Sequence, residues 1–401
     1  MSNAYDVLII GGGPAGLAAG LYASRSKLNT ILLETNSQLG GQVSTYHEME
    51  NYPGVLDTTA PELMDNFKEH AKSFGTKIEK AEVQEVETGD FIKTIKTKDG
   101  IKYQAKSVIV ATGAEPRRLG VPGEEEFKGK GVSYCATCDA DFFVDLEVVV
   151  VGNGNSAIEE ALYLTKFASK VTVIVIHDQG TMDADKIYQE RAYQNDKIEF
   201  VWNSTLEEVK GEGLVDTAVL KNVKTGEKTD FSCDGIFIFI GRVPRTDFLE
   251  GIVDLTDNGY IKTNDKLETS VPGVYAAGDV RNKFLRQVVT AAADGATTAA
   301  AAGGYIEEEE YWQENVLEAE EDVLVAFWSP TNEESLKMTG KLENMDLEAK
   351  GVKLVKIDTY KNTRISNRYD VTEVPTLLKI EDGEVAEKIT QPTETEIEEL
   401  I

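Results

Sequence analysis

Two cysteines at a redox spacing carry the strongest chemical signal in the sequence. Cys135 and Cys138 are separated by Ala136 and Thr137, and Asp139 follows at once. Two thiols three positions apart at a helix start can close a disulfide, and the helix dipole favours the reactive thiolate. A neighbouring carboxyl group can take up and return the thiol proton. These residues predict a dithiol that cycles between reduced and oxidised states.

The remaining cysteine and the histidines do not complete a metal site around this pair. Cys233 and the three histidines, His47, His70 and His177, all lie away from ligand spacing to the dithiol. Structural zinc takes four such ligands. We therefore expect no metal, and we expect Cys233, which precedes an apolar strand, to be a packing residue.

Two glycine-rich turns predict two nucleotide sites. Each follows an apolar strand, and they read Gly11-x-Gly13-x-x-Gly16 and Gly152-x-Gly154-x-x-Ala157. Such glycines let the backbone approach a pyrophosphate closely at the N-terminus of the next helix. Glu34 and Asp178 follow the second strands of the two units, where a carboxylate can accept hydrogen bonds from a ribose.

Length and charge restrict the class of protein. A chain of 401 residues predicts several domains, and none of its apolar runs approaches the length of a membrane span. The net charge of -29 opposes contact with nucleic acid or anionic lipid. The N-terminal residues lack a secretion signal, so we expect a cytoplasmic location.

Charge also predicts a domain boundary. Residues 306–401 carry 25 acidic and 10 basic side chains, so this last quarter holds about half of the net charge. Four consecutive glutamates, Glu307 to Glu310, favour an acidic linker over 306–312. A new strand pattern begins at Val323, so we expect a separate domain over 313–401.

Further motifs resemble those of the low-molecular-weight thioredoxin reductases, in the family's order. They are Gly40-Gly41-Gln42, Glu50-Asn51-Tyr52-Pro53-Gly54, Ala111-Thr112-Gly113, Cys135-Ala136-Thr137-Cys138-Asp139, Ala276-Ala277-Gly278-Asp279 and Arg286-Gln287. The resemblance implies that the first nucleotide is FAD. The FAD contacts it implies are Gly11, Gly13, Pro14, Ala15, Gly16, Glu34, Gly41, Gln42, Asn51, Ala111, Thr112, Gly113, Gly278, Asp279, Arg286, Gln287 and Val288.

The same resemblance implies roles for the redox residues. Cys138 would face the flavin, Cys135 would attack the substrate disulfide, and Asp139 would act as acid and base. The implied substrate is thioredoxin or a thioredoxin-like protein, and the implied assembly is a homodimer in which one domain rotates. The family's usual glycine after Asp139 is replaced by Ala140-Asp141, and an added carboxylate would raise the thiol pKa.

The second nucleotide site departs from the family. Gly152, Gly154, Asn155, Ser156 and Ala157 match its pyridine-nucleotide turn, but residues 175–184 hold neither arginine nor lysine. NADPH-dependent members have an arginine cluster there. Asp178 would repel a 2′-phosphate and accept a hydrogen bond from a free 2′-hydroxyl, which favours NADH. The alternative is a ferredoxin-dependent flavin thioredoxin reductase.

The last domain resembles thioredoxin without its chemistry. Val374-Pro375 stands at that fold's cis-proline position, whereas Asn332-Glu333-Glu334-Ser335 replaces the family's CGPC motif. Thr331 and Glu334 have the spacing of a helix capping box. We expect a domain for docking or for stabilising a dimer.

These signals together predict an α/β protein. Two doubly wound Rossmann-like domains would comprise an FAD-binding domain, residues 1–115 and 243–305, and an inserted pyridine-nucleotide-type domain, residues 116–242, that carries the dithiol. The expected activity is FAD-dependent reduction of thioredoxin disulfide. The alternative from another class is a flavin-bearing docking or sensor protein.

Overall fold

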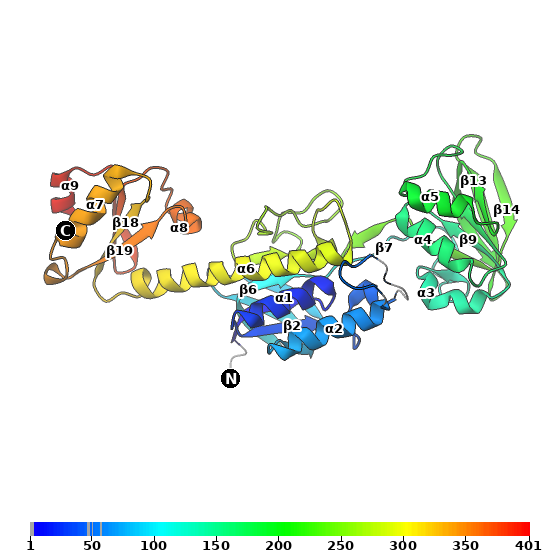
Figure 1. The fold of residues 1–401 in the computed structure, drawn as a ribbon, viewed down its shortest axis with the longest axis horizontal. Helices are drawn as coiled ribbons and strands as arrows, with labels where there is room; N and C mark the ends of the chain where they lie inside the picture. The colour runs from blue at the N-terminus through cyan, green and yellow to red at the C-terminus, as the bar shows by residue number, and fades with distance from the viewer. Residues whose placement is uncertain (1–3, 46–48, 50, 57) are drawn as a thin grey trace. The chain divides into compact units, whose positions relative to one another are not determined.

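The computed structural model describes residues 4–45, 49, 51–56 and 58–401, and for Thr45, Thr137 and Cys138 it describes only the backbone. The chain forms two compact units, residues 1–301 and 302–401 (Figure 1). Among the described residues, no helix combines the length and apolar character needed to cross a membrane.

The first sheet of the larger unit is built around the N-terminal strand. Its order is β3-β2-β1-β6-β5-β4, and β17 also pairs with β6. The strands are β1 (Ala4–Ile10), β2 (Thr30–Glu34), β3 (Lys77–Lys80), β4 (Val83–Thr88), β5 (Lys93–Thr97), β6 (Lys102–Val110) and β17 (Val274–Ala276). Strands β1, β2, β3, β6 and β17 run parallel, and β4 and β5 are antiparallel.

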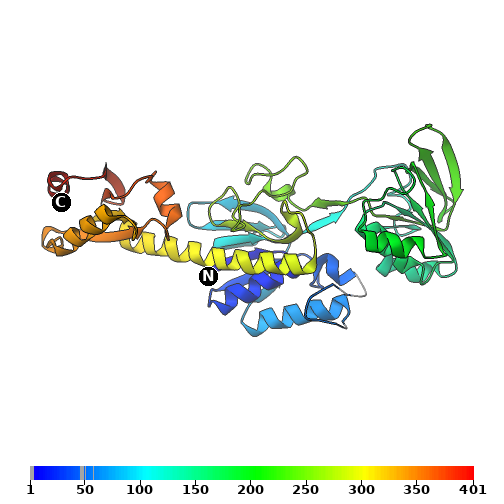
Figure 2. The same ribbon diagram turned by 45° about the horizontal axis from the view of Figure 1, so that its top comes forward.

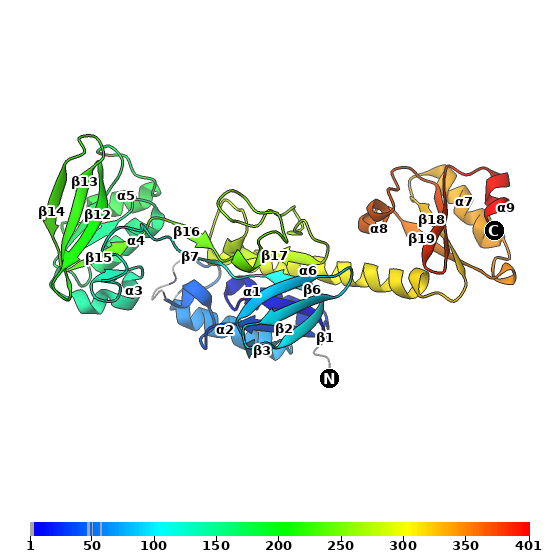
Figure 3. The same cartoon turned by 180° about the vertical axis from the view of Figure 1, so that it is seen from behind.

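Apolar residues cover both faces of this sheet. Leu8 and Ile10 of β1 belong to a buried cluster with Leu249 and Ile261, while Ile9 faces helix α1 (Pro14–Arg25). Helix α2 (Ala60–Ser73) packs beside α1, and Figures 1 and 3 show α1 on one face of the sheet. Continuous apolar strands of this kind are typical of parallel sheets that are covered on both sides.

A second parallel sheet is formed by residues that lie in the sequence between β6 and β17. Its order is β11-β10-β9-β15-β8, all parallel. The strands are β8 (Val132–Ser133), β9 (Glu147–Val151), β10 (Lys170–Ile174), β11 (Ile198–Val201) and β15 (Gly235–Ile238). Strands β7 (Ala114–Pro116) and β16 (Arg242–Pro244) pair with each other where the chain enters and leaves this region.

Helices and a β-meander cover the two faces of this second sheet. One face packs against α3 (Ala136–Asp139), α4 (Asn155–Leu164) and α5 (Lys186–Tyr193). The other face packs against β12 (Ser204–Gly211), β13 (Val215–Asn222) and β14 (Lys228–Ser232), as Figure 3 shows. The predicted fold class is confirmed, because two Rossmann-type sheets are present.

The smaller unit has a four-stranded sheet of order β19-β18-β20-β21. Its elements are β18 (Asp322–Trp328), β19 (Val352–Asp358), β20 (Thr376–Glu381), β21 (Glu384–Thr390), α7 (Glu333–Asn344), α8 (Thr363–Arg368) and α9 (Glu394–Leu400). The Val374-Pro375 bond is cis, as expected. The predicted cap differs by one residue: Asn332 caps α7 by accepting the Ser335 N–H at 2.8 Å, and the Thr331 hydroxyl bonds to Ser329.

The predicted acidic linker over 306–312 is wrong. These residues form the last turns of α6 (Val288–Trp312), which Figure 2 shows as one continuous yellow helix. Trp312 is fully buried in the core of the smaller unit, and Glu309 is 3% exposed and ion-paired with Arg368. Of the four glutamates, Glu307 is exposed, Glu309 is buried and the other two are half-buried, so the acidity of the run does not mark a solvated segment.

Candidate active site

The first glycine turn leaves room for a pyrophosphate. Gly11 has φ +110°, and a Cβ there would lie 2.4 Å from the Ala111 carbonyl oxygen. A Cβ on Gly16 would lie 1.9 Å from the Gly11 oxygen, whereas one on Gly13 would meet nothing within 4 Å. Gly13 caps α1 without any side-chain hydrogen bond. The turn is therefore closely packed at Gly11 and Gly16 and open at Gly13, where the N-terminus of α1 favours an anion.

Glu34 braces this turn through its carboxylate. Its Oε2 accepts the Gly12 N–H at 2.7 Å, and its Oε1 accepts the Asn36 N–H at 2.8 Å. A carboxylate has about four acceptor positions, so both oxygens keep lone pairs for a hydroxyl donor.

A charged cluster that no sequence motif predicted holds the Gly278-Asp279 turn. Asp294, on α6, accepts the Gly278 N–H at 3.0 Å and pairs with Arg281 at 2.8 Å and Lys283 at 2.7 Å. Burial opposes ionisation of Asp294, but these hydrogen bonds hold its pKa below the usual value. The cluster ties the turn to the helix that begins at the predicted flavin contacts.

Two buried polar atoms at this turn lack partners among the described residues. They are Asp279 Oδ1 and Arg286 Nε. Burial raises the pKa of Asp279, opposed by the charges of Lys283, Arg242 and Arg286. The Arg286 guanidinium lies over the Tyr260 ring, 4.4 Å from its centroid. Orphaned buried donors and acceptors in a native fold call for a ligand, and the hydroxyl and carbonyl groups of FAD fit both.

Side chains from distant segments meet around the same region. Asn51 donates to Gln287 at 3.1 Å, Arg242 donates to Gln42 at 3.1 Å, and Thr112 donates to the Arg245 carbonyl at 2.8 Å. The structure thus brings four of the predicted flavin motifs into hydrogen-bonded contact with other segments.

Two other predicted positions near this region have different outcomes. Val288 is 9% exposed and packs with Met64. Glu50, part of one flavin motif, lies outside the described residues.

The dithiol segment is held by Ser133. Cys135 is disulfide-bonded and half-buried, and Cys138 lies on α3 with its side chain outside the described part. Ser133 Oγ donates to Asp139 Oδ2 at 2.6 Å and accepts the Cys135 N–H at 3.1 Å. One hydroxyl therefore fixes both the peptide of Cys135 and the carboxyl predicted to move its proton. Ser133 belongs to none of the predicted motifs.

Cys233 is a packing residue, as expected. It is 4% exposed in an apolar cluster, and it is a free thiol. Burial, together with the charge of Asp234, raises its pKa to about 12. A thiol with such a pKa carries little thiolate at neutral pH and is a poor nucleophile.

The second glycine turn repeats the geometry of the first. Gly152 has φ +130°, and a Cβ there would lie 2.1 Å from the Phe239 oxygen, whereas one on Gly154 would meet nothing within 4 Å. Asn153 Nδ2 is buried without a partner among the described residues. The Asn155 side chain exchanges hydrogen bonds with Asp185 at 2.8 and 2.6 Å.

Lys224 supplies the cation that residues 175–184 lack. It comes from the β13–β14 turn and forms an ion pair with Asp178. This hydrogen bond and the lysine charge lower the pKa of Asp178. The prediction that a lone carboxylate faces the ribose is incomplete, because the two residues are 46 positions apart and only the fold pairs them.

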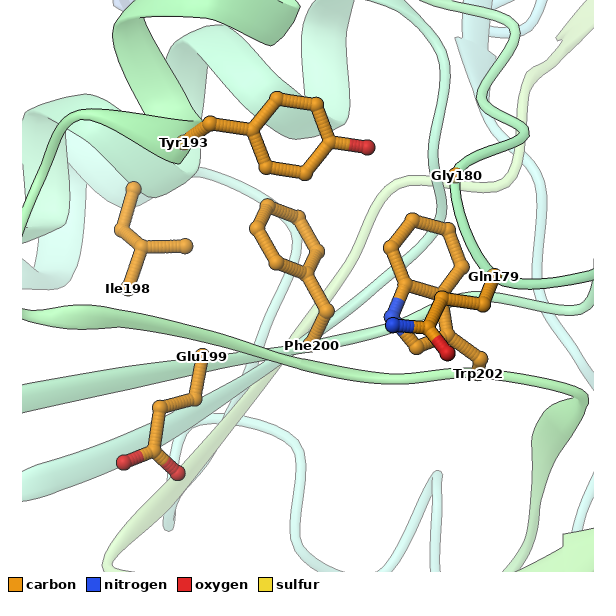
Figure 4. Close-up of a pocket in the computed structure, with 7 residues that line it drawn as sticks. All are labelled: Gln179, Gly180, Tyr193, Ile198, Glu199, Phe200 and Trp202. Atoms are coloured by element: carbon orange, nitrogen blue, oxygen red, sulfur yellow. The ribbon is translucent and has the colours of Figure 1, made fainter.

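An open aromatic hollow adjoins Asp178. It measures about 480 Å³ and is lined by Gln179, Gly180, Tyr193, Ile198, Glu199, Phe200 and Trp202 (Figure 4). The rings of Phe200 and Trp202 stack with centroids 5.3 Å apart. The hollow runs along β11, and its Gln179, Gly180 and Trp202 follow the carboxyl ends of β10 and β11, at the edge of the sheet where the Gly152 turn follows β9.

Comparison with known sequences defines the class to which this fold and site belong. The profile of the pyridine nucleotide-disulphide oxidoreductase family matches residues 5–295, and that of thioredoxin matches residues 305–401. The chain is 51% identical over 298 residues to a thioredoxin reductase of Peptoclostridium acidaminophilum, covering 73% of this chain and 93% of that protein. It is 46% identical over 288 residues to that of Bacillus subtilis, covering 72% and 90%.

Solved structures agree. Lactococcus lactis thioredoxin reductase, in a conformation labelled FR, superposes with a TM-score of 0.73 at 43% identity, covering 76% of this chain and 99% of that one. T. acidophilum thioredoxin reductase gives a TM-score of 0.71 at 34% identity, covering 77% of this chain and 100% of that one. The chain belongs to the thioredoxin reductases of the pyridine nucleotide-disulphide oxidoreductase family. It is an FAD-dependent disulfide oxidoreductase with a C-terminal thioredoxin-like domain.

Proposed function

We propose that this enzyme takes electrons from NADH and passes them through FAD and the Cys135/Cys138 dithiol to the disulfide of a thioredoxin-like protein. FAD, when bound, accepts an electron pair from the donor and delivers it to a disulfide. The observation that carries the proposal is the disulfide at Cys135 beside the Ser133–Asp139 pair, in a chain that also retains both nucleotide turns.

The residues around the dithiol have distinct tasks in this proposal. Cys138 exchanges with the flavin and Cys135 with the substrate disulfide. Asp139, oriented by Ser133 at 2.6 Å, takes the proton of the attacking thiol and returns it to the departing one. Cys233 takes no part, because its burial keeps it protonated.

The proposal that NADH is the donor depends on the surroundings of Asp178, which follows β10 at the edge of the second sheet. Its carboxylate can accept hydrogen bonds from both hydroxyls of an adenosine ribose, and the hollow beside it offers stacked rings to a planar base. Lys224 neutralises part of the negative charge of Asp178. Because its ammonium group is paired with that carboxylate, Lys224 is not a free cation that could bind a 2′-phosphate. This arrangement supports NADH as the better donor. We propose further that the enzyme acts as a homodimer.

An anaerobic titration tests the donor. NADH, NADPH and reduced ferredoxin are added separately to the yellow holoenzyme, and the flavin absorbance is followed. We expect stoichiometric NADH to bleach the flavin and NADPH to require a large excess. Bleaching by stoichiometric NADPH, or by ferredoxin alone, would contradict the assignment.

Two cysteine variants test the electron path. Cys138→Ser should retain FAD and flavin reduction by NADH but lose thioredoxin reduction by at least about 10³-fold, since the exchanging thiol is gone. Cys233→Ser is the matched control and should retain turnover. Equal activity of the two variants would remove the dithiol from the path.

A further inference from the structure

A buried carboxyl group lies against the dithiol helix and has no task in the proposal above. Glu160, on α4, is 4% exposed, and its carboxyl accepts the backbone N–H of Ala136, the residue after Cys135. Its Oε2 is buried without a hydrogen-bond partner in the described part of the chain. Helices α3 and α4 pack against each other, so this acid is fixed to the peptide that follows the reactive sulfur.

The electrostatics of Glu160 differ from those of the exposed carboxyls. Burial raises its pKa to about 7, and the charge of Glu159 on the same helix adds to the rise. The Ala136 N–H and the charge of Arg242, from β16, oppose it. Asp139, the acid on α3, is bonded to Ser133 and is not among the groups that shift this pKa. Among the described residues no charged group of α5, β9 or β10 contributes to this pKa.

Resting on the proposed function, we propose that Glu160 is a positioning residue of the dithiol that holds the first peptide of α3 and binds a solvent proton when the disulfide is reduced. Reduction breaks the S–S bond with two electrons and one proton from the reduced flavin, and it leaves one thiol and one thiolate. The new negative charge disfavours ionised Glu160, which takes one proton from water and becomes neutral. The summed charge of Glu160 and the dithiol is therefore the same before and after reduction.

The direction of the pH effect follows from this coupling. The pKa of Glu160 is higher beside the thiolate than beside the disulfide. Between these two values, from about pH 7 upward, reduction takes up one extra proton. In this range the equilibrium constant for reduction of the disulfide falls as pH rises. For each pH unit the fall is up to about tenfold larger than in a protein whose residue 160 cannot titrate.

The test measures the dithiol equilibrium of the holoenzyme in dithiothreitol redox buffers from about pH 6 to about pH 9. Thiols at Cys135 and Cys138 are counted by alkylation and mass spectrometry. Glu160→Gln keeps an oxygen that accepts the Ala136 N–H but cannot titrate. Glu190→Gln, an exposed carboxyl on α5, is the control. Above about pH 7 the wild-type constant should fall more steeply than that of Glu160→Gln, and Glu190→Gln should follow the wild type.

Three results would overturn the inference. Profiles of equal slope in wild type and Glu160→Gln, or a ratio that is constant at every pH, would leave Glu160 a structural role only. If Glu160→Gln does not fold, Glu159→Gln decides, because loss of the like charge must move the wild-type break to lower pH. A dithiol that never forms thiols in any variant would sink the proposed function as well, which separates the two failures.

Discussion

Single charged side chains decide what each nucleotide turn can hold. The two glycine turns share one backbone geometry, so the turns themselves do not distinguish FAD from a pyridine nucleotide. The difference lies in the groups around them. Asp279 and Arg286 leave buried polar atoms unpaired at the first site, whereas Asp178 and Lys224 form a closed ion pair at the edge of the second.

Opening that ion pair should change donor choice. In Asp178→Asn, Lys224 loses its carboxylate partner and becomes available to a 2′-phosphate. We expect kcat/KM for NADPH to rise by up to about fivefold and that for NADH to fall, because the freed lysine can pair with a 2′-phosphate while the pair remains exposed to solvent. Steady-state kinetics with both donors provide the measurement. Asp183→Asn, an exposed acid of the same loop, is the control, and an unchanged NADPH/NADH ratio would refute the specificity role.

The Asp294 cluster should make flavin retention sensitive to acid. The pKa of Asp294 is depressed in the folded state, so its contribution to stability is present above the unfolded value of about 3.9 and disappears as pH falls through the folded value. At neutral pH, Asp294→Asn should lower the unfolding free energy by about 3 kcal/mol, because two buried cations lose their partner. Thermal unfolding followed by flavin fluorescence should show this difference shrinking below about pH 4. A difference that is constant with pH would exclude the carboxylate charge as its cause.

At the scale of elements, α6 serves two cores. Its first half approaches α1 so closely that a Cβ on Gly295 would lie 2.1 Å from the Ala15 oxygen. Its last turns place Trp312 in the core of the smaller unit, where the indole lies 5.1 Å from the Tyr369 ring, and Glu308 pairs with Arg364 at 3.3 Å. The compact-unit boundary therefore falls inside a helix, after Ala301.

Truncating Trp312 should destabilise the smaller unit selectively. In the full chain, Trp312→Ala should lower the unfolding free energy of that unit by about 3–5 kcal/mol, the usual effect of removing a large buried aromatic side chain. Differential scanning calorimetry should show its transition moving down while the flavin-bearing transition stays in place. Tyr311→Ala, at a neighbouring residue that is 47% exposed, should have little effect. Similar shifts for the two variants would show that residues 306–312 are a linker after all.

At the scale of the whole molecule, the reductase and the thioredoxin-like domain are separable in sequence. The curated relatives are matched over about nine tenths of their length by the first three quarters of this chain. We expect a chain that ends at Ala301 to reduce a small disulfide substrate within about twofold of the full chain, since residues 1–301 form a compact unit of their own. Turnover with an aromatic disulfide such as dithiobisnitrobenzoate measures this. Complete loss of activity in a folded, yellow truncation would favour the docking or sensor alternative.

Features that depend on a few neighbouring residues were predicted well from the sequence. Both glycine turns, the dithiol and the cis bond before Pro375 were found from spacing and resemblance. The cap of α7 is Asn332 instead of the predicted Thr331. Such ends depend on single hydrogen bonds, which composition does not specify.

The sequence by itself determined the chemistry: a dithiol, two dinucleotide turns and a thioredoxin-like domain without cysteines. Only the tertiary structure decided which charges meet. Lys224 reaches Asp178 across 46 residues, Asp294 gathers Arg281 and Lys283, and Glu160 reaches the peptide after Cys135. The physical reason is that motifs record backbone needs within a few residues, whereas ion pairs and burial depend on strands and helices brought together by sheet order.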